Sequence, residues 1–299
     1  MKKLKAVWEL MRLGHGVMLV IAIIVGSVIG YKIIHDTIGF PPYYKFLLAF
    51  FTALFLEASA FALNDYFDLE IDKKNKRTDR PLVRGDLSPK TALVLFGILF
   101  PLGIICSYFV NLTCFIIALV TAFLAILYDV KLKKIKMLGN FYIAYTMAIP
   151  FIFGGATVLQ QNTFTLAIPQ IVYIIAFIAF LAGVGREIMK DVMDVKGDKK
   201  EGVKSFPTTI GIRKSNVLAA IFYIIAIALS FLPFMSRNFV VYYQNYYYLI
   251  VVLITDVMLI ATASLLFTKK ELDMKFHRNF TLVALFIGLL AFLIGAFTG

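Results

Sequence analysis

The stretch Asn64–Gly85, NDYFDLEIDKKNKRTDRPLVRG, places three aspartates where a long apolar run meets a basic loop. These are Asp65, Asp68 and Asp72, so the spacing is D-x2-D-x3-D. Offsets of three and seven residues put the three side chains on one helical face, within about 60° of arc. Carboxylates beside a bilayer are costly unless cations hold them, so the stretch predicts a helix that ends in a cation site.

The same spacing recurs in Gly185–Gly202, GREIMKDVMDVKGDKKEG, at Asp191, Asp194 and Asp198. Two such faces turned toward each other would form a Mg2+ cage, and Mg2+ sites of this kind commonly hold phosphates. Either stretch alone could be a solvated polar loop at a helix end. The recurrence of the spacing favours a functional pair.

Composition defines the class of protein. The chain has 299 residues, is 61% hydrophobic and has a mean hydropathy of +0.85. Soluble domains are about half apolar, so we expect an all-α integral membrane protein. The polar segments are too short to fold separately, which predicts one domain, 1–299. No small-residue cleavage site follows the charged start MKKLKAVWELMRLGHG, so we expect no removable signal peptide.

The apolar runs predict nine transmembrane helices, each near the roughly 20 residues that a bilayer core requires. The third and fourth are separated by a tight turn at Asn111. The expected spans are 14–34, 45–67, 89–109, 112–128, 139–159, 167–189, 216–235, 246–267 and 279–298.

Lysine and arginine predict the orientation of these spans. With nine spans, 27 of the 30 basic residues fall on one side of the membrane. The positive-inside rule then places the N-terminus and the basic loops in the cytoplasm, in a multi-pass plasma-membrane protein. The net charge of +12 is spread over short loops, so we expect no nucleic-acid partner.

The two aspartate motifs lie four spans apart, which returns both to the same face of the membrane. This placement predicts two tandem four-helix units, roughly 14–128 and 139–267, plus a ninth helix at 279–298. We expect the helices to form a bundle around a central cavity. Both motifs would lie at its cytoplasmic mouth.

Basic residues near the motifs are candidates for phosphate binding. Arg77, Arg80 and Arg84 follow the first motif, and a planar guanidinium suits bidentate phosphate contacts. Arg186 and Lys190 precede the second motif, although an Arg186–Glu187 pair could be purely structural.

A third polar patch, Tyr128–Lys136 (YDVKLKKIK), lies between spans four and five on the same face. Tyr128 could contact an acceptor or a phosphate, and Lys131, Lys133 or Lys134 could bind phosphate oxygens. The lysines could equally be ordinary positive-inside residues.

Two acidic residues lie within the predicted spans. Glu57 shares the face of the first motif, whereas Asp256 suggests a structural contact between helices.

The sequence gives less support to Cys or His metal sites, to nucleotide binding and to transport. Cys106 and Cys114 show no CxxC or metal spacing, and the three histidines are isolated. The soluble nucleotide-binding patterns GxGxxG and GxxxxGK[ST] are absent. A transporter remains an alternative, because carriers also contain repeats and intramembrane acids.

NDYFDLEID with RPL downstream, together with REIMKDVMDVKGD, resembles the paired motifs of the UbiA superfamily of intramembrane prenyltransferases. The resemblance implies Mg2+ as cofactor and an isoprenoid diphosphate, a lipid-like acceptor and membrane lipid as partners, with no obligate protein partner. Three sets of site residues are implied. The metal set is Asn64, Asp65, Asp68, Asp72, Asp191, Asp194 and Asp198; the diphosphate set is Asn64, Arg77, Arg80, Arg186, Lys190 and Lys133; the catalytic set is Asp65, Asp68, Asp191, Asp194, Tyr128 and Lys131.

Within the superfamily, the motifs look most like the archaeal branch that makes ether lipids. That likeness implies geranylgeranyl transfer from its diphosphate to the free hydroxyl of geranylgeranylglyceryl phosphate. The alternative acceptor is an aromatic ring, as in quinone or haem pathways. The chain departs from the family at His15, where Asn is common, at Asp129, where Pro often follows the tyrosine, and at Ser205, where Thr is frequent.

Overall fold

The computed structural model describes residues 2–12, 16–200, 202–268 and 274–299; His15 therefore lies outside it. The described residues form helices joined by turns, without a strand. The α-helices are α1 (Lys2–Met11), α2 (Gly16–His35), α3 (Tyr43–Lys74), α4 (Pro81–Arg84), α5 (Pro89–Val110), α6 (Leu112–Val130), α7 (Lys136–Ala156), α8 (Gln170–Lys200), α9 (Phe206–Ile210), α10 (Ile212–Ser230), α11 (Leu232–Met235), α12 (Tyr246–Thr268) and α13 (Met274–Thr298).

Among the described residues, nine helices are long and apolar enough to cross a membrane, which confirms the predicted fold class. Their ends lie within five residues of the predicted bounds, except at two polar ends. The helix α3 continues to Lys74 and α8 to Lys200, beyond the predicted ends at 67 and 189. In both cases the apolar run ends before the helix does, so the aspartate motifs lie on the polar last turns of α3 and α8. The central cavity and the cytoplasmic N-terminus stay predictions.

The chain forms two compact units. The first comprises Met1–Val20, Phe40–Lys131 and Ala156–Leu166, and the second Ile21–Gly39, Leu132–Gly155 and Ala167–Gly299. Most of α2 thus packs with the second unit, whereas the tandem division would place it in the first. The tandem organisation and the single domain stay predictions.

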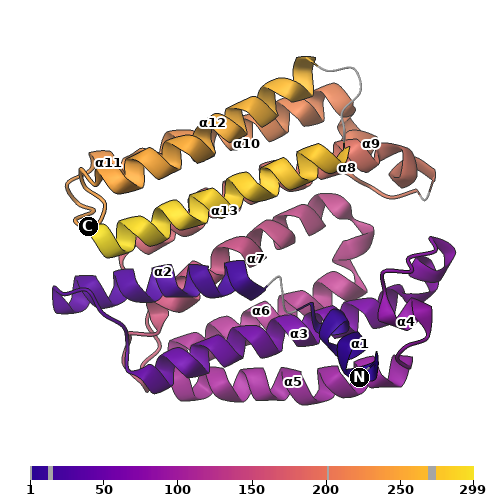
Figure 1. Cartoon of the computed structure of the whole chain (residues 1–299), viewed down its shortest axis with the longest axis horizontal. Coiled ribbons are helices and arrows are strands. Elements are labelled where there is room, and N and C mark those ends of the chain that lie inside the picture. The colour runs from indigo at the N-terminus through magenta and orange to yellow at the C-terminus, as the bar shows by residue number, and fades with distance from the viewer. Residues whose placement is uncertain (1, 13–15, 201, 269–273) are drawn as a thin grey trace. The chain divides into compact units, whose positions relative to one another are not determined.

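In the first unit, α3 packs along α5 and also contacts α6, α1 and α4 (Figure 1). Gly103 permits the close approach of α5 to α3, since a Cβ there would lie 2.8 Å from Leu56 Cγ. The predicted turn at Asn111 is confirmed, because α5 ends at Val110 and α6 begins at Leu112. The Asn111 side chain caps α6 by accepting a 2.8 Å hydrogen bond from the Cys114 amide.

In the second unit, α8 packs against α10, α10 against α12, and α12 against α13 (Figure 1). The helices α2 and α7 cross at glycines. A Cβ on Gly26 would lie 2.1 Å from the Phe151 carbonyl oxygen, and one on Gly154 would lie 2.3 Å from that of Ile23. This backbone approach, with a 3.1 Å hydrogen bond from Ser27 to the Gly154 carbonyl, explains why α2 belongs to this unit.

One intramembrane acid has a structural contact. Ser230 on α10 donates a 2.8 Å hydrogen bond to Asp256 on α12, and both side chains are buried. The Tyr248 hydroxyl donates to the Ser230 carbonyl at 2.7 Å. These bonds join two helices of the second unit, as expected for Asp256.

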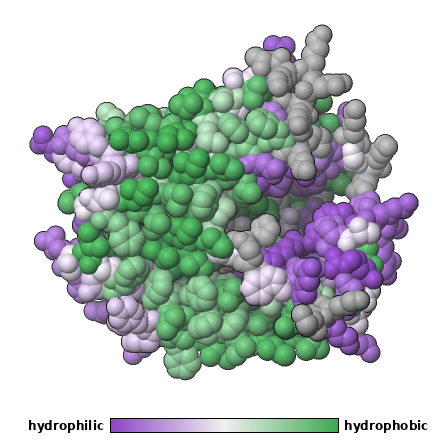
Figure 2. All heavy atoms as spheres, in the orientation of Figure 1, coloured by the Kyte–Doolittle hydropathy of each residue, from purple (hydrophilic) through white to green (hydrophobic). Residues whose placement is uncertain are grey.

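The surface is divided by polarity. In the face that Figure 2 shows, apolar side chains cover the flanks of the helices and hydrophilic side chains gather at their ends. Apolar flanks can contact hydrocarbon, whereas the loops and helix ends require water or headgroups.

Candidate functional site

The first aspartate motif lies on the last turns of α3. Asp65 and Asp72 are buried, at 2% and 8% exposure, and Asp68 is half-buried. Arg12 and Arg80 both donate hydrogen bonds to Asp65 Oδ1, the latter at 2.8 Å. Arg80 Nε also lies 3.8 Å from Asp72 Oδ2. Two guanidinium groups therefore neutralise this carboxylate face.

The loop after α3 places Arg80 on the motif. The Arg77 amide donates to the Asp72 carbonyl at 3.0 Å, so the chain folds back directly after α3. Arg80 then occupies the N-cap position of α4, whose first residue is Pro81, and its side chain is left to contact the motif. Gly85 ends that short helix with a φ of 78°, a conformation that glycine adopts readily. Local turn chemistry thus brings Arg80 back to Asp65.

Arg77 has a different environment from Arg80. Its side chain is 46% exposed and donates two 2.9 Å hydrogen bonds to Asp79. These bonds raise the pKa of Arg77 and lower the pKa of Asp79. Of the two arginines of this loop in the predicted diphosphate set, Arg80 lies on the motif and Arg77 pairs within the loop.

Asn64 connects the first motif to the third polar patch. Its amide donates a 2.7 Å hydrogen bond to Asp129, the residue that follows Tyr128. Tyr128 is half-buried on the last turn of α6, and Lys131 is exposed directly after that helix. Lys133 is half-buried in a 3-10 turn, Leu132–Lys134, which begins the segment Leu132–Gly155 of the second unit.

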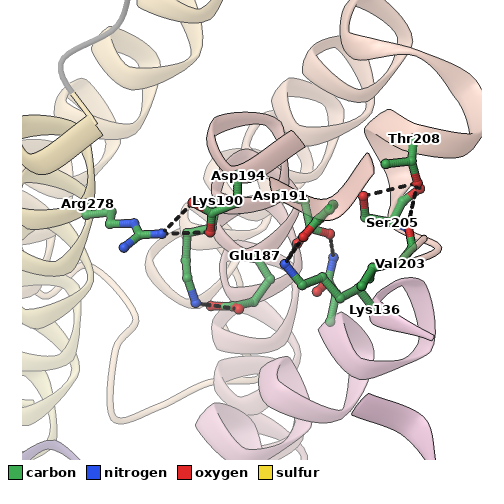
Figure 3. Close-up of polar contacts among 11 residues, drawn as sticks. Lys136, Glu187, Lys190, Asp191, Asp194, Val203, Ser205, Thr208 and Arg278 are labelled. Carbon is green, nitrogen blue, oxygen red and sulfur yellow. Dashed lines mark hydrogen bonds and ion pairs between the residues drawn. The ribbon is translucent and has the colours of Figure 1, made fainter. Parts of the chain in front are cut away.

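The second motif lies on the last turns of α8, where Asp191 and Asp198 are buried and Asp194 is half-buried. Each carboxylate has its own donor (Figure 3). Asn140 donates to Asp191 at 2.7 Å, and Lys136 donates to Asp198 at 2.7 Å. Arg278 on α13 donates to both oxygens of Asp194, at 3.0 and 2.7 Å.

Arg186 and Lys190 converge on one carboxylate. Arg186 lies 3.1 Å and Lys190 2.7 Å from the oxygens of Glu187, which is buried. Figure 3 shows the Lys190–Glu187 contact on the same helix as Asp191 and Asp194. The Arg186–Glu187 pair is thus present, and two cations share one acid beside the motif.

Beyond α8, Ser205 is fully buried at the start of α9. Its backbone N–H donates a 2.8 Å hydrogen bond to the Thr208 hydroxyl oxygen, and its own hydroxyl lies 3.3 Å from the same oxygen (Figure 3). This capping arrangement orders the segment that follows the second motif.

The two motifs share a pattern of burial. In each, the first and last aspartates are buried and the middle one is half-buried. Within the described residues, no three Asp, Glu, His or Cys side chains gather closely enough to hold a metal ion by themselves. Mg2+ usually takes one or two carboxylates and completes its shell with water and phosphate. Asp65 Oδ2 and Asp198 Oδ2 are buried and accept no hydrogen bond from described residues, so the donor set fits Mg2+.

Sequence reasoning missed four partners of the aspartates. Arg12, Asn140 and Arg278 lie near the ends of other helices. The two arginines entered only the count of basic residues, and Asn140 was not among the predicted site residues. Lys136 belongs to the third patch, but its link to the second motif carries no local signal. The four residues are Arg12, Lys136, Asn140 and Arg278.

The fold and these acidic helix ends define a multi-pass membrane protein with two cation-rich carboxylate motifs. The chain belongs to the UbiA prenyltransferase family, whose model matches residues 19–290. It is 43% identical over 296 residues to the digeranylgeranylglyceryl phosphate synthase of Archaeoglobus fulgidus, covering 98% of this chain and 96% of that relative.

Solved structures agree with this assignment. One described as digeranylgeranylglyceryl phosphate synthase in membranes is 35% identical, with a TM-score of 0.78 and 99% of each chain covered. A UbiA homologue from Archaeoglobus fulgidus bound to DMAPP and Mg2+ shares the fold at 16% identity, with a TM-score of 0.58, covering 96% of this chain and 98% of that one. The predicted family and enzyme class, a prenyltransferase, are confirmed over the transporter alternative.

Proposed function

We propose that this protein transfers a geranylgeranyl group from geranylgeranyl diphosphate to the free hydroxyl of geranylgeranylglyceryl phosphate, in archaeal ether-lipid synthesis. The observation that carries the proposal is the pair of D-x2-D-x3-D motifs, each at the polar end of a membrane-length helix and each in contact with cations. The names of the relatives at 43% and 35% identity support this acceptor over an aromatic ring.

The six motif aspartates, with Asn64, would hold Mg2+. Asp65 and Asp198 each have one buried oxygen that accepts no hydrogen bond from the described part of the chain, which supports this role. The homologue of the same fold that binds Mg2+ with DMAPP supports it as well. Bound Mg2+ would neutralise charge on the diphosphate as it leaves. Arg80 lies beside Asp65 of the first motif, and Arg186 and Lys190 lie beside Glu187, which precedes the second motif. Each of these cations can donate to a diphosphate oxygen.

The reaction exchanges one C–O bond for another. The allylic C–O bond to diphosphate breaks, its electron pair leaves with the diphosphate, and the acceptor oxygen bonds to the allylic carbon. The hydroxyl proton ends on the released diphosphate, either directly or through the Tyr128 hydroxyl, which would take it up while giving its own proton to the diphosphate. Lys131, Lys133 and Arg77 would contribute further positive charge. Apolar helix flanks would receive the prenyl chains and keep water from the reacting carbon.

We also propose where the protein lies and how its helices are organised. We place the protein in the plasma membrane, with both motifs on the cytoplasmic side, because the basic loops lie at those helix ends. It acts as a single transmembrane prenyltransferase domain of tandem four-helix units, without an obligate protein partner.

A transfer assay on purified protein tests the proposal. Labelled geranylgeranyl diphosphate and Mg2+ are supplied with geranylgeranylglyceryl phosphate in one tube and 4-hydroxybenzoate in another. We expect product with the first acceptor alone. Product with the second alone would move the protein to aromatic prenylation, and absence of product from the folded protein with either acceptor would reject both.

A further inference from the structure

The short helix α1 has two opposite apolar faces. Ala6 and Leu10 are buried in a cluster with residues of α3, α4 and α5. Leu4 and Trp8 are 78% and 61% exposed. At about 100° per residue, these two pairs lie on opposite sides of the helix. One face is therefore covered by protein, and the second points away from the first unit.

The packing of α1 indicates its depth relative to the membrane. Its buried face shares one hydrophobic cluster with Ala62 and Leu69 of α3 and with Ala92 near the start of α5, and α1 itself packs against α3 and α4. The 32 residues of α3 extend for about 48 Å, whereas a bilayer core is about 30 Å thick. The helix α1 therefore lies beside the turns where two spans pass from hydrocarbon to water.

The charges on α1 match an anionic surface. Lys3 and Lys5 are exposed and lie about 100° to either side of Leu4. Lys5 Nζ is 4.0 Å from Glu9, an exposed pair of little energetic weight. Lysines that flank an apolar face containing tryptophan are typical of helices that lie in the headgroup region.

We propose that α1 is an interfacial anchor, whose face of Leu4, Trp8, Lys3 and Lys5 binds the anionic lipid surface of the membrane that the chain spans. The anchored helix also holds part of the first motif. Glu9 on α1 accepts a hydrogen bond from Arg84, and Arg12 directly after α1 donates to Asp65. Lipid contact at α1 thus restrains the residues that surround Asp65.

The only tryptophan of the chain, Trp8, reports this contact. The full chain is placed in nanodiscs of phosphatidylcholine and phosphatidylglycerol with brominated acyl chains, and Trp8→Phe defines the background emission. We expect the brominated lipid to remove most of the Trp8 emission, and acrylamide in the water to remove little. Quenching by acrylamide alone would show a water-exposed helix, and quenching by neither would show a protein covering such as a second copy; both overturn the proposal.

The lysines are tested by a paired comparison. Phosphatidylglycerol should increase quenching by brominated lipid relative to phosphatidylcholine alone. Lys3→Gln with Lys5→Gln should abolish that increase, whereas the matched exposed pair Lys73→Gln with Lys76→Gln should retain it. If the α1 double variant also retains the increase, the assignment to anionic lipid is overturned.

Discussion

Asn140 on α7 donates a hydrogen bond of 2.7 Å to Asp191 on α8, and both side chains are buried. A buried polar group left without its partner costs about 1–3 kcal/mol. The amide therefore holds a motif carboxylate in one position within the second unit. Loss of that bond should affect both folding and the use of metal.

Asn140→Ala should lower the free energy of unfolding by about 1–3 kcal/mol and raise the Mg2+ concentration needed for half-maximal transfer. Thermal denaturation in detergent and Mg2+ titrations of transfer measure the two effects. The matched control is Asn216→Ala, since Asn216 is also buried and donates one 2.9 Å bond, to the Leu266 carbonyl. The Asn216→Ala variant should lose a similar amount of stability, but the Mg2+ concentration that it needs for half-maximal transfer should not change. If both variants reach half-maximal transfer at the same Mg2+ concentration, the role of Asn140 is purely structural.

Asp68→Ala and Asp194→Ala should each abolish prenyl transfer while the protein stays folded in the membrane. The two side chains are half-buried, so their removal should cost less stability than removal of the buried aspartates. The transfer assay with thermal denaturation separates the two effects. Glu70→Ala, which removes an exposed carboxylate from the same helix as Asp68, should remain active. Wild-type turnover in either aspartate variant would contradict the proposed site.

Arg80 and Arg77 should differ in their effect on stability. Arg80→Gln should lower the free energy of unfolding by about 1–3 kcal/mol, because the buried carboxylates of Asp65 and Asp72 lose a cationic partner. Arg77→Gln should change it by less than about 1 kcal/mol, since its partner Asp79 is exposed. Chemical denaturation of the two variants in the same detergent makes the comparison. A larger loss for Arg77→Gln would contradict the contacts described for this loop.

Removal of metal should stop transfer and leave the protein folded. In the second unit, Lys136 and Arg278 form ion pairs with Asp198 and Asp194, and in the first unit arginines form ion pairs with Asp65. These pairs offset the repulsion among the carboxylates. EDTA should therefore abolish transfer, excess Mg2+ should restore it, and the thermal midpoint should shift little. Unfolding by EDTA would instead show that the metal is structural.

The nine spans could be predicted from the sequence because hydropathy acts over about 20 neighbouring residues, and a bilayer requires each such run to cross it as a helix. The D-x2-D-x3-D spacing likewise predicts aspartates on one helical face, because helical periodicity depends only on positions along the chain. The family followed from the same two motifs.

The partners of these aspartates depended on tertiary structure. Asp65 meets Arg12 from 53 residues away, Asp191 meets Asn140 from 51, and Asp194 meets Arg278 from 84. No local pattern links such positions, because which donor reaches a carboxylate depends on how the helices pack. The place of α2 in the second unit was decided in the same way, by the close approach of its backbone at Gly26 to α7. Local chemistry therefore determined the helices and their polar ends, and packing determined which side chains neutralise them.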